Sequence, residues 1–301
     1  MTPEYLAAHS LEEALEHLRL KGDKTKILAG GTDVLVQWRT ARMNGDAPPD
    51  FFLDVTHITD LQKIAFTAEE AYIGAAVTFR QLEIHPDLQK KCPLLSRASS
   101  QIGSLQVRHL ATLGGNVGTA SPAGDGITPL VALSAEAIIG SMRGNRSLPV
   151  ADLITGPGKK SLETDELIIG FSLKMPSQPE ATFFDKVMRR QAMAIARMNV
   201  AIQLVLDSSD KISSAQLAAG AVLPRPRRLK EVEEVLVNQS PGEVLFSAAG
   251  EKATQVMLTE SGNRPSMIYK VPALKRLVTQ GLRHACMERM IGHSGKSRNA
   301  G

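Results

Sequence analysis

A cluster of glycines in the first half of the chain constrains its fold more than any other feature. It occupies residues 111–133, where small hydroxyl residues separate the glycines and an apolar run, 127–133, follows at once. The glycines are Gly114, Gly115, Gly118, Gly124 and Gly126. Glycine loses more conformational entropy on folding than any other residue and fills no core. Such a cluster therefore indicates either tight turns or a backbone that approaches a ligand and offers NH groups to an anion such as a pyrophosphate.

A second glycine turn precedes this cluster. Residues 26–35, KILAGGTDVL, predict a short apolar strand, a turn at Gly30 and Gly31, and the start of an apolar helix. Bare amides and the hydroxyl of Thr32 again stand where a strand ends and a helix begins. Two such turns in one domain could hold one diphosphate from two sides.

The two motifs, AGGTDV and ATLGGNVGTASPAGD, resemble the FAD-binding signatures of the flavin subunit in the molybdenum hydroxylase group. That group includes xanthine, carbon monoxide, nicotinate and aldehyde dehydrogenases. The likeness runs from the first helix to about Arg283, so it covers nearly the whole chain.

The resemblance implies an α+β fold in three parts. Residues 1–176 would form an FAD-binding PCMH-type (vanillyl-alcohol-oxidase-like) domain of two α+β lobes. Residues 181–287 would form a small CO-dehydrogenase-flavoprotein-like domain, with a three-stranded antiparallel sheet and three helices. We expect the polar segment 288–301 to be a disordered tail.

The residues themselves predict elements that agree with this division. Ser10 and Glu13 form a capping-box pattern before an apolar helical face, and Thr78 is a second candidate cap. Apolar runs predict a strand at 51–55 and hairpins that pair 64–66 with 71–75 and 137–142 with 146–150. A helix from residue 88 to 102 should break near Pro93. The proline-rich segment 175–179 marks a domain boundary, followed by three strands (183–188, 198–206, 212–222) and three helices (229–237, 242–256, 266–283).

Composition excludes several functional classes. Aromatic residues make up only 4% of the 301 residues and the net charge is +4, so we expect no nucleic-acid partner. The two cysteines, Cys92 and Cys286, cannot hold an iron–sulfur cluster alone, and we expect them to be reduced and structural. We expect no membrane span and a cytoplasmic location, because no apolar run is long enough and the N-terminus lacks a signal-peptide pattern. The sequence also lacks an HxxxH pair, a GxSxG elbow and a GxGxxG fingerprint.

The resemblance implies a cofactor-binding set but no catalytic residue and no metal ligand in this chain. The set is Ile27, Ala29, Gly30, Gly31, Thr32, Asp33, Val34, Ile102, Thr112, Gly115, Asn116, Thr119, Asp125, Ile168, Ile169 and Lys186. Backbone amides of the first turn, and of Thr112, Gly115, Asn116 and Thr119 in the second, would hold the diphosphate. The isoleucines and Val34 would be apolar contacts, with plain core positions as the alternative.

Three members of this set carry side-chain chemistry. Asp125 stands where the family places an acidic residue on the cofactor, and a turn-forming aspartate is the alternative. Lys186 matches a position near the flavin ring, where it could stabilise the reduced, anionic form, and a surface lysine is the alternative. For Asp33, the alternative is a charge favoured at a helix N-terminus.

Some positions depart from the family pattern or remain open. Ile102 is aliphatic where relatives often place a bulky residue against the flavin. His109 replaces the asparagine of the usual Ile-Arg-Asn, which we interpret as a structural substitution. The arginine runs 189–190 and 225–228 fit either a solvated surface or a contact with a partner subunit.

The function that the resemblance implies is electron transfer. The chain would bind FAD and join a small subunit with two [2Fe-2S] clusters and a large molybdopterin subunit in a hetero-oligomer such as a dimer of heterotrimers. Electrons would pass from the nearer cluster through FAD to an external acceptor such as NAD. The alternatives are a self-sufficient flavoprotein oxidoreductase that acts directly on a small substrate, and a nucleotide-binding scaffold without redox turnover.

Overall fold

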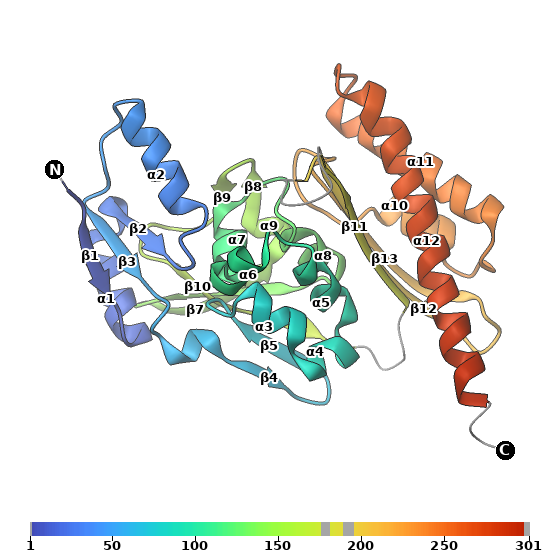
Figure 1. Cartoon of the computed structure of the whole chain (residues 1–301), viewed down its shortest axis with the longest axis horizontal. Coiled ribbons are helices and arrows are strands. Elements are labelled where there is room, and N and C mark those ends of the chain that lie inside the picture. Colours follow the sequence, from blue (N-terminus) through green and yellow to red (C-terminus); the bar gives the residue numbers. More distant parts are fainter. Residues whose placement is uncertain (1, 176–180, 189–195, 298–301) are drawn as a thin grey trace.

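The computed structural model describes residues 2–175, 181–188 and 196–297, with side chains through Met287. The chain forms three parts along its long axis: an N-terminal lobe, a central lobe and a C-terminal domain (Figure 1). No helix in these described ranges combines the length and the hydropathy needed to cross a bilayer.

The N-terminal lobe is a small parallel sheet with two helices. Its strands β1 (Glu4–Ala7), β2 (Thr25–Leu28) and β3 (Phe51–Asp54) pair in the order β1-β3-β2. Helix α1 (Leu11–Lys21) begins at Ser10, whose hydroxyl accepts the Glu13 amide at 3.1 Å as the capping pattern predicts. A short 3-10 turn, Gly22–Lys24, leads from α1 to β2. Helix α2 (Val34–Met43) follows the first glycine turn and buries none of its residues.

The central lobe carries a five-stranded antiparallel sheet in the order β4-β5-β10-β6-β7. Its strands are β4 (Ile64–Phe66), β5 (Glu70–Gly74), β6 (Glu136–Ser141), β7 (Gly144–Pro149) and β10 (Leu167–Lys174). A 3-10 turn, Thr59–Gln62, enters the sheet, and a small hairpin of β8 (Ile154–Gly156) and β9 (Lys159–Lys160) stands beside it. Both predicted hairpins are confirmed by the pairing of β4 with β5 and of β6 with β7.

Seven short helices cover one face of this sheet. They are α3 (Phe79–Ile84), α4 (Pro86–Lys91), α5 (Pro93–Ser100), α6 (Leu105–Leu110), α7 (Leu113–Thr119), α8 (Ile127–Ala132) and α9 (Val150–Leu153). Thr78 and Gln81 form a full capping box on α3. The break near Pro93 is confirmed, because α4 ends at Lys91 and α5 starts at the proline.

Strand β10 joins the two lobes because both of its faces are buried. Ile168 and Phe171 lie in the core beneath the helices of the central lobe. Leu167 and Ile169 lie in a second core, which includes Leu15 of α1. The continuous apolar run of β10 is typical of a strand with no solvent-exposed face.

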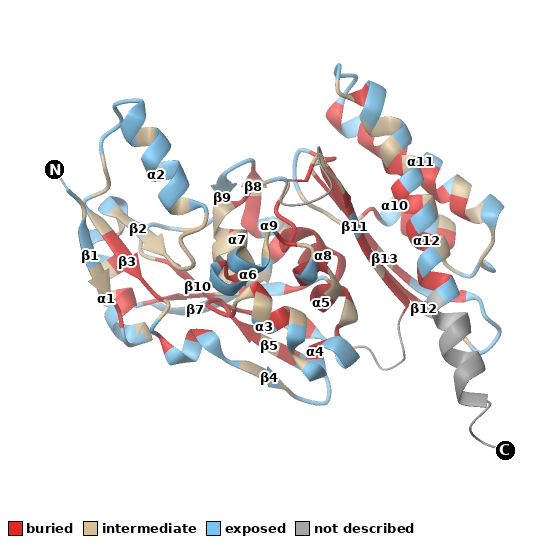
Figure 2. Cartoon of the chain, viewed as in Figure 1, coloured by how far each residue is buried: buried red, intermediate tan, exposed pale blue. Residues whose placement is uncertain are grey.

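The C-terminal domain is a three-stranded antiparallel sheet between two helical layers. Strands β11 (Ala181–Val187), β12 (Met198–Leu206) and β13 (Ile212–Gly220) pair in sequence order. Helices α10 (Lys230–Leu236), α11 (Glu243–Ser261) and α12 (Met267–Ser297) follow. Helices α11 and α12 lie on the outer side of the sheet, whose buried strands stand out in Figure 2.

The two faces of β12 show how this sheet divides its contacts. Val200 and Ile202 lie in the core formed with the C-terminal helices. Ala201 lies in the core of the central lobe, where α5 and α8 pack against the sheet. Side chains at odd positions of β12 therefore face the central lobe, since successive side chains of a strand point to opposite faces.

The end of the chain differs from the expected tail. Helix α12 continues to Ser297, past residue 288, where we predicted disorder to begin. The physical reason is that Pro272 is the last proline, so nothing after it blocks the i to i−4 hydrogen bonds. Residues 298–301 lie outside the described part of the chain.

Candidate functional site

The first glycine turn lies against the second glycine stretch. A β carbon on Gly30 would overlap the main-chain carbonyl of Leu110 and lie 2.8 Å from the Cα of Ala111. Gly31 has a φ of +69°, in the left-handed region that favours glycine. The two motifs, far apart in the sequence, therefore meet where the N-terminal and central lobes touch.

The turn leaves a row of backbone amides without acceptors. Within the part of the chain that the structure describes, the NH groups of Gly30, Gly31, Thr32 and Asp33 donate no hydrogen bond. Two of their carbonyls are used at the start of helix α2, since Gly31 accepts from the Leu35 amide at 3.3 Å and Asp33 accepts from the Gln37 amide at 2.9 Å. Free amides at the start of a helix attract an anion, because they are donors and lie at the positive end of the helix dipole.

The second stretch differs from the open turn that we predicted. Residues Leu113–Thr119 form helix α7, and the hydroxyl of Thr112 caps it by accepting from the Gly115 amide at 3.0 Å. The Asn116 amide donates to the Thr112 carbonyl at 3.0 Å. The amides of Gly115 and Asn116 are therefore already used inside the protein. The cause is the Thr112 cap, which turns a glycine-rich segment into a short helix.

Two side chains of α7 extend the site. The hydroxyl of Thr119 donates to the Gly115 carbonyl at 2.9 Å and lies 3.4 Å from Oδ2 of Asp33, across the contact between the lobes. Oδ1 of Asn116 accepts from the Gly126 amide at 3.1 Å. Asn116 thereby holds the loop that carries Asp125.

Gly118 was not in the predicted set, and its surroundings single it out. A β carbon on this residue would have no atom within 4 Å, and its φ is not positive. It lies inside α7, where glycine is less favourable than alanine. Neither packing nor backbone conformation requires glycine here, which is the pattern expected where a ligand approaches the backbone.

Asp125 and Lys186 lie together although they belong to different domains. Nζ of Lys186 donates to Oδ2 of Asp125 at 2.5 Å, and the side chains are only 3% and 11% exposed. Nδ2 of Asn199, on β12, donates to Oδ1 of the same carboxylate at 2.7 Å. The alternatives of a surface lysine and a simple turn aspartate therefore do not describe these residues. Asn199 was missed because MNVAIQLVL reads as a plain apolar strand.

The apolar members of the predicted set lie at different depths. Ile102, Ile168 and Ile169 are all buried in the cores of the lobes. Ile27 and Val34 are partly buried, as is Ala29 at the end of β2. The three buried isoleucines serve the cores directly, so any contact with a cofactor would be an additional role.

The remaining sequence features have structural partners. Arg108 donates to Glu83 at 2.9 Å and to the Ile102 carbonyl, while its neighbour His109 is exposed. Arg227 pairs with Glu231 and Glu260, and Arg228 pairs with Glu233. Arg227 is thus held inside the C-terminal domain, whereas Arg228 also donates to the Ser134 hydroxyl of the central lobe at 3.0 Å. The run 189–190 lies outside the described residues.

The donor set fits a dinucleotide and offers little to other chemistries. Free amides suit a diphosphate, and the open space at Gly118 leaves room beside them. The buried Lys186 suits a ring that gains negative charge on reduction. No group of three histidine, cysteine, aspartate or glutamate side chains that could hold a metal ion occurs in the described ranges.

Comparisons with known proteins agree with this geometry. Residues 1–176 match the family described as the FAD binding domain in molybdopterin dehydrogenase. Residues 183–285 match the CO dehydrogenase flavoprotein C-terminal domain. The chain is similar in fold to carbon monoxide dehydrogenase from Hydrogenophaga pseudoflava, with a TM-score of 0.86 and 24% identity over 95% of this chain and 98% of that one. The predicted fold class is thereby confirmed.

Sequence similarity to curated relatives extends along nearly the whole chain. It is 30% identical to the nicotinate dehydrogenase FAD-subunit of Eubacterium barkeri, over 89% of this chain and 90% of that protein. It is also 30% identical to the xanthine dehydrogenase FAD-binding subunit of Escherichia coli O157:H7, over 93% of this chain and 95% of that protein. The chain therefore belongs to the family of FAD-binding subunits of the molybdenum hydroxylases, and it is an oxidoreductase subunit.

Proposed function

We propose that this chain is the electron-transfer subunit of a molybdopterin-dependent hydroxylase or dehydrogenase. It takes electrons from the [2Fe-2S] clusters of a small partner subunit and passes them through FAD to an external acceptor such as NAD. A large molybdopterin subunit hydroxylates the organic substrate. The assembly is a hetero-oligomer, such as a dimer of heterotrimers, in the cytoplasm. Membership of the family of flavin subunits supports this proposal.

The observation that carries the proposal is the row of free amides at the start of α2. Gly30, Gly31, Thr32 and Asp33 would hold the FAD diphosphate, with α7 as the opposite wall. FAD, when bound, supplies the redox chemistry, because its ring can accept electrons singly and release them in pairs. The protein binds and orients the cofactor and shields one end of the site with the C-terminal sheet.

The site offers this chain little means to act on an organic substrate. Its buried titratable pair, Asp125 and Lys186, is bonded internally, so neither group is poised as a free acid or base. This arrangement favours electron transfer over direct substrate oxidation. It leaves hydroxylation to the partner that carries molybdopterin.

The direct test is FAD binding by the purified chain. The single tryptophan, Trp38, lies on α2, the helix that follows the proposed diphosphate site, and provides a fluorescence signal for titration. We expect saturable binding of one FAD per chain and a flavin absorption spectrum. A chain that binds no FAD, either purified or after addition of the cofactor, would refute the proposal.

A second measurement separates electron transfer from self-sufficient catalysis. The FAD-loaded chain, alone, should oxidise none of a panel of N-heterocycles and aldehydes. Addition of the reduced iron–sulfur subunit should reduce its flavin, and NAD should then reoxidise it. Substrate turnover by the chain alone would favour the self-sufficient oxidoreductase instead.

A further inference from the structure

Asn199 occupies a fixed position between the two domains. It is fully buried on β12, at an odd position that faces the central lobe. Its Oδ1 accepts from the Thr128 hydroxyl at 2.6 Å and from the Gly220 amide at 3.0 Å. Because both of these partners are donors, the oxygen must face them and the NH₂ group must face Asp125.

Gly220 is the residue that makes this arrangement sterically possible. A β carbon at Gly220 would overlap Oδ1 of Asn199 and lie 2.5 Å from the Thr128 hydroxyl oxygen. The φ of Gly220 is not in the left-handed region, so its backbone conformation does not require glycine. Close packing around the Asn199 side chain is what excludes any larger residue.

The Asn199 amide in turn determines where the Asp125 carboxylate lies. One carboxylate oxygen accepts from Asn199 and the other accepts from Lys186, so the two bonds together prevent rotation of the carboxylate. Without Asn199, Oδ1 of Asp125 would lose its donor in a buried site. The carboxylate would turn toward other donors, and the Lys186 ammonium bonded to it would move as well.

We propose that Asn199 is a positioning residue for the flavin: held by Thr128 and Gly220, it fixes Asp125 and, through Asp125, the Lys186 ammonium. This inference rests on the proposed function, because Lys186 has a redox role only if FAD binds beside it. The relevant property is orientation, since an ammonium aimed at the developing negative charge of a ring favours its reduced form. A purely structural role for Asn199 would alter stability and leave the redox potential unchanged.

The test is the two-electron reduction potential of bound FAD in Asn199→Ala, with the dissociation constant of oxidised FAD as a second readout. We expect reduced FAD to bind about tenfold more weakly and oxidised FAD to bind about as before. A tenfold change corresponds to about 30 mV for two electrons, so the potential should become more negative by that amount.

A matched control lies on the same strand. Gln203 is four residues from Asn199 on the same face of β12, is 7% exposed, and donates to Gln216 at 2.8 Å. Gln203→Ala therefore removes a comparable buried amide that has no bond to Asp125. We expect the potential of this variant to equal that of the wild type.

Two smaller changes, both at Thr128, test the inference if Asn199→Ala does not fold. Thr128→Val removes the hydroxyl that holds Asn199 while it preserves the shape, and Thr128→Ser keeps the hydroxyl. We expect a more negative potential for the valine variant and the wild-type value for the serine variant. Equal potentials in the valine and serine variants would overturn the inference.

The outcomes separate the inference from the function on which it rests. A wild-type chain that binds no FAD overturns both. A wild-type chain that binds FAD, with equal potentials in Asn199→Ala and Gln203→Ala, leaves the proposed function in place and overturns the role of Asn199. A shift in Asn199→Ala and Thr128→Val alone supports it.

Discussion

The Cα of Gly30 lies directly against the main-chain carbonyl of Leu110, with no room for a β carbon between them. Gly30 follows β2 of the N-terminal lobe, and Leu110 ends α6 of the central lobe. Glycine at this position therefore serves the contact between lobes, whereas Gly31 provides the left-handed bend. The free amides of the turn depend on both conditions.

Gly30→Ala should destabilise the protein, and Gly118→Ala should not. The first change forces a methyl group into the Leu110 carbonyl, and overpacking of this kind costs about 1–3 kcal/mol. The second adds a methyl group in open space within a helix, where alanine is favoured by about 0.5–1 kcal/mol. Urea unfolding of the FAD-free chain measures both. An unchanged or raised midpoint for Gly30→Ala would mean that the contact between the lobes is not as close as described, and a lowered midpoint for Gly118→Ala would mean that the space beside Gly118 is not open.

The same two variants should behave differently toward FAD. Gly118→Ala keeps the fold of the chain but places a methyl group where α7 faces the proposed cofactor. We expect weaker FAD binding, by about tenfold, in a variant of normal or raised stability. A titration followed by Trp38 fluorescence measures it, and an unchanged dissociation constant would place the cofactor away from Gly118.

Gly31→Ala should lose about 1–2 kcal/mol of stability, because its φ of +69° is unfavourable for residues with a β carbon. Gly31→Asn should lose less, since asparagine tolerates the left-handed region. The measurement is again the free energy of unfolding. Equal losses for both substitutions would assign the cost to the nearby Leu35 side chain instead of the backbone.

The buried pair of Asp125 and Lys186 should show strong coupling in a double-mutant cycle. Lys186→Met leaves a buried carboxylate without its cation, and breaking such a pair costs about 3–5 kcal/mol. Asp125→Asn removes the charge but keeps the shape. The double variant should lose much less than the sum of the single losses, because neither charge is then left alone. Additive losses would mean that the two side chains act independently.

Local patterns predicted most of the elements but not how they meet. Thr78 and Ser10 mark helix starts through their own hydroxyl groups, and alternating apolar residues mark the hairpins, so these predictions needed no distant partner. The parallel strand β1 was missed because Glu4–Ala7 alone has no periodicity to distinguish it. Its strand character comes from pairing with β3, which lies far along the chain.

The sequence predicted which stretches contribute to the site, but not how they are arranged in space. Glycine content located both stretches, but the same glycines occur in open turns and in short helices such as α7. The Thr112 cap favours the short helix over an open turn, and no other feature of the sequence excludes this cap. The pairing of Asp125 with Lys186 was out of reach for a different reason. It depends on how the C-terminal sheet docks on α5 and α8, which no local pattern encodes.

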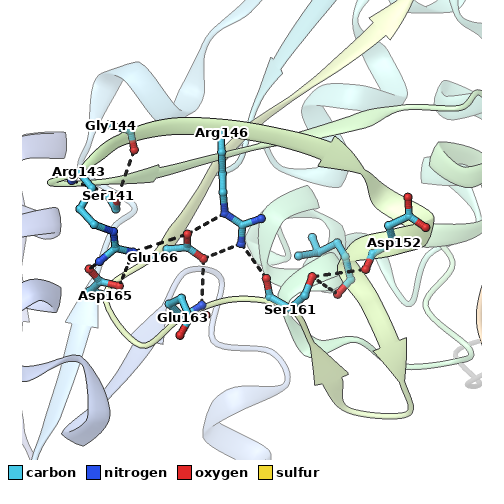
Figure 3. Close-up of polar contacts among 10 residues, drawn as sticks. Ser141, Arg143, Gly144, Arg146, Asp152, Ser161, Glu163, Asp165 and Glu166 are labelled. Carbon is cyan, nitrogen blue, oxygen red and sulfur yellow. Dashed lines mark hydrogen bonds and ion pairs between the residues drawn. The ribbon is translucent and has the colours of Figure 1, made fainter.

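An ion-pair cluster at the far edge of the central sheet holds the segment on which the N-terminal lobe rests (Figure 3). Arg146 on β7 donates two hydrogen bonds of 2.7 Å to Glu166 and one of 2.8 Å to the Ser161 carbonyl. Arg143 pairs with Asp165 beside it. A β carbon on Gly22 would overlap the Thr164 carbonyl, so the turn after α1 packs against this same segment.

The cluster should make stability depend on pH in the acidic range. Hydrogen bonds from Arg146 hold the pKa of Glu166 below its ordinary value of 4.5. A carboxyl group with a lowered folded pKa contributes stability above its unfolded pKa and loses it as the pH falls through the folded value. Wild-type stability should therefore decline as the pH drops below 4.5, with Glu166 among the causes.

Arg146→Met should abolish that contribution and so isolate it. At pH 7 the variant removes the two direct hydrogen bonds from Arg146 to the buried Glu166 carboxylate and leaves it only one cation, the more distant Arg143, 3.9 Å away, so we expect a loss of about 2–3 kcal/mol, as for hydrogen bonds to charged groups. As the pH falls below 4.5, Glu166 takes up a proton in the variant first, and the difference from wild type should shrink. Arg143→Met is the control: the Arg143 side chain is 61% exposed and lies 3.9 Å from Glu166, so its loss should cost much less stability than that of Arg146. Urea unfolding of all three proteins between pH 3 and 7 gives the comparison.

A constant difference in stability between Arg146→Met and wild type across this pH range would contradict the role of the ion pair. It would mean that Arg146 stabilises the edge through packing and its bond to Ser161, because neither of these depends on the charge of Glu166.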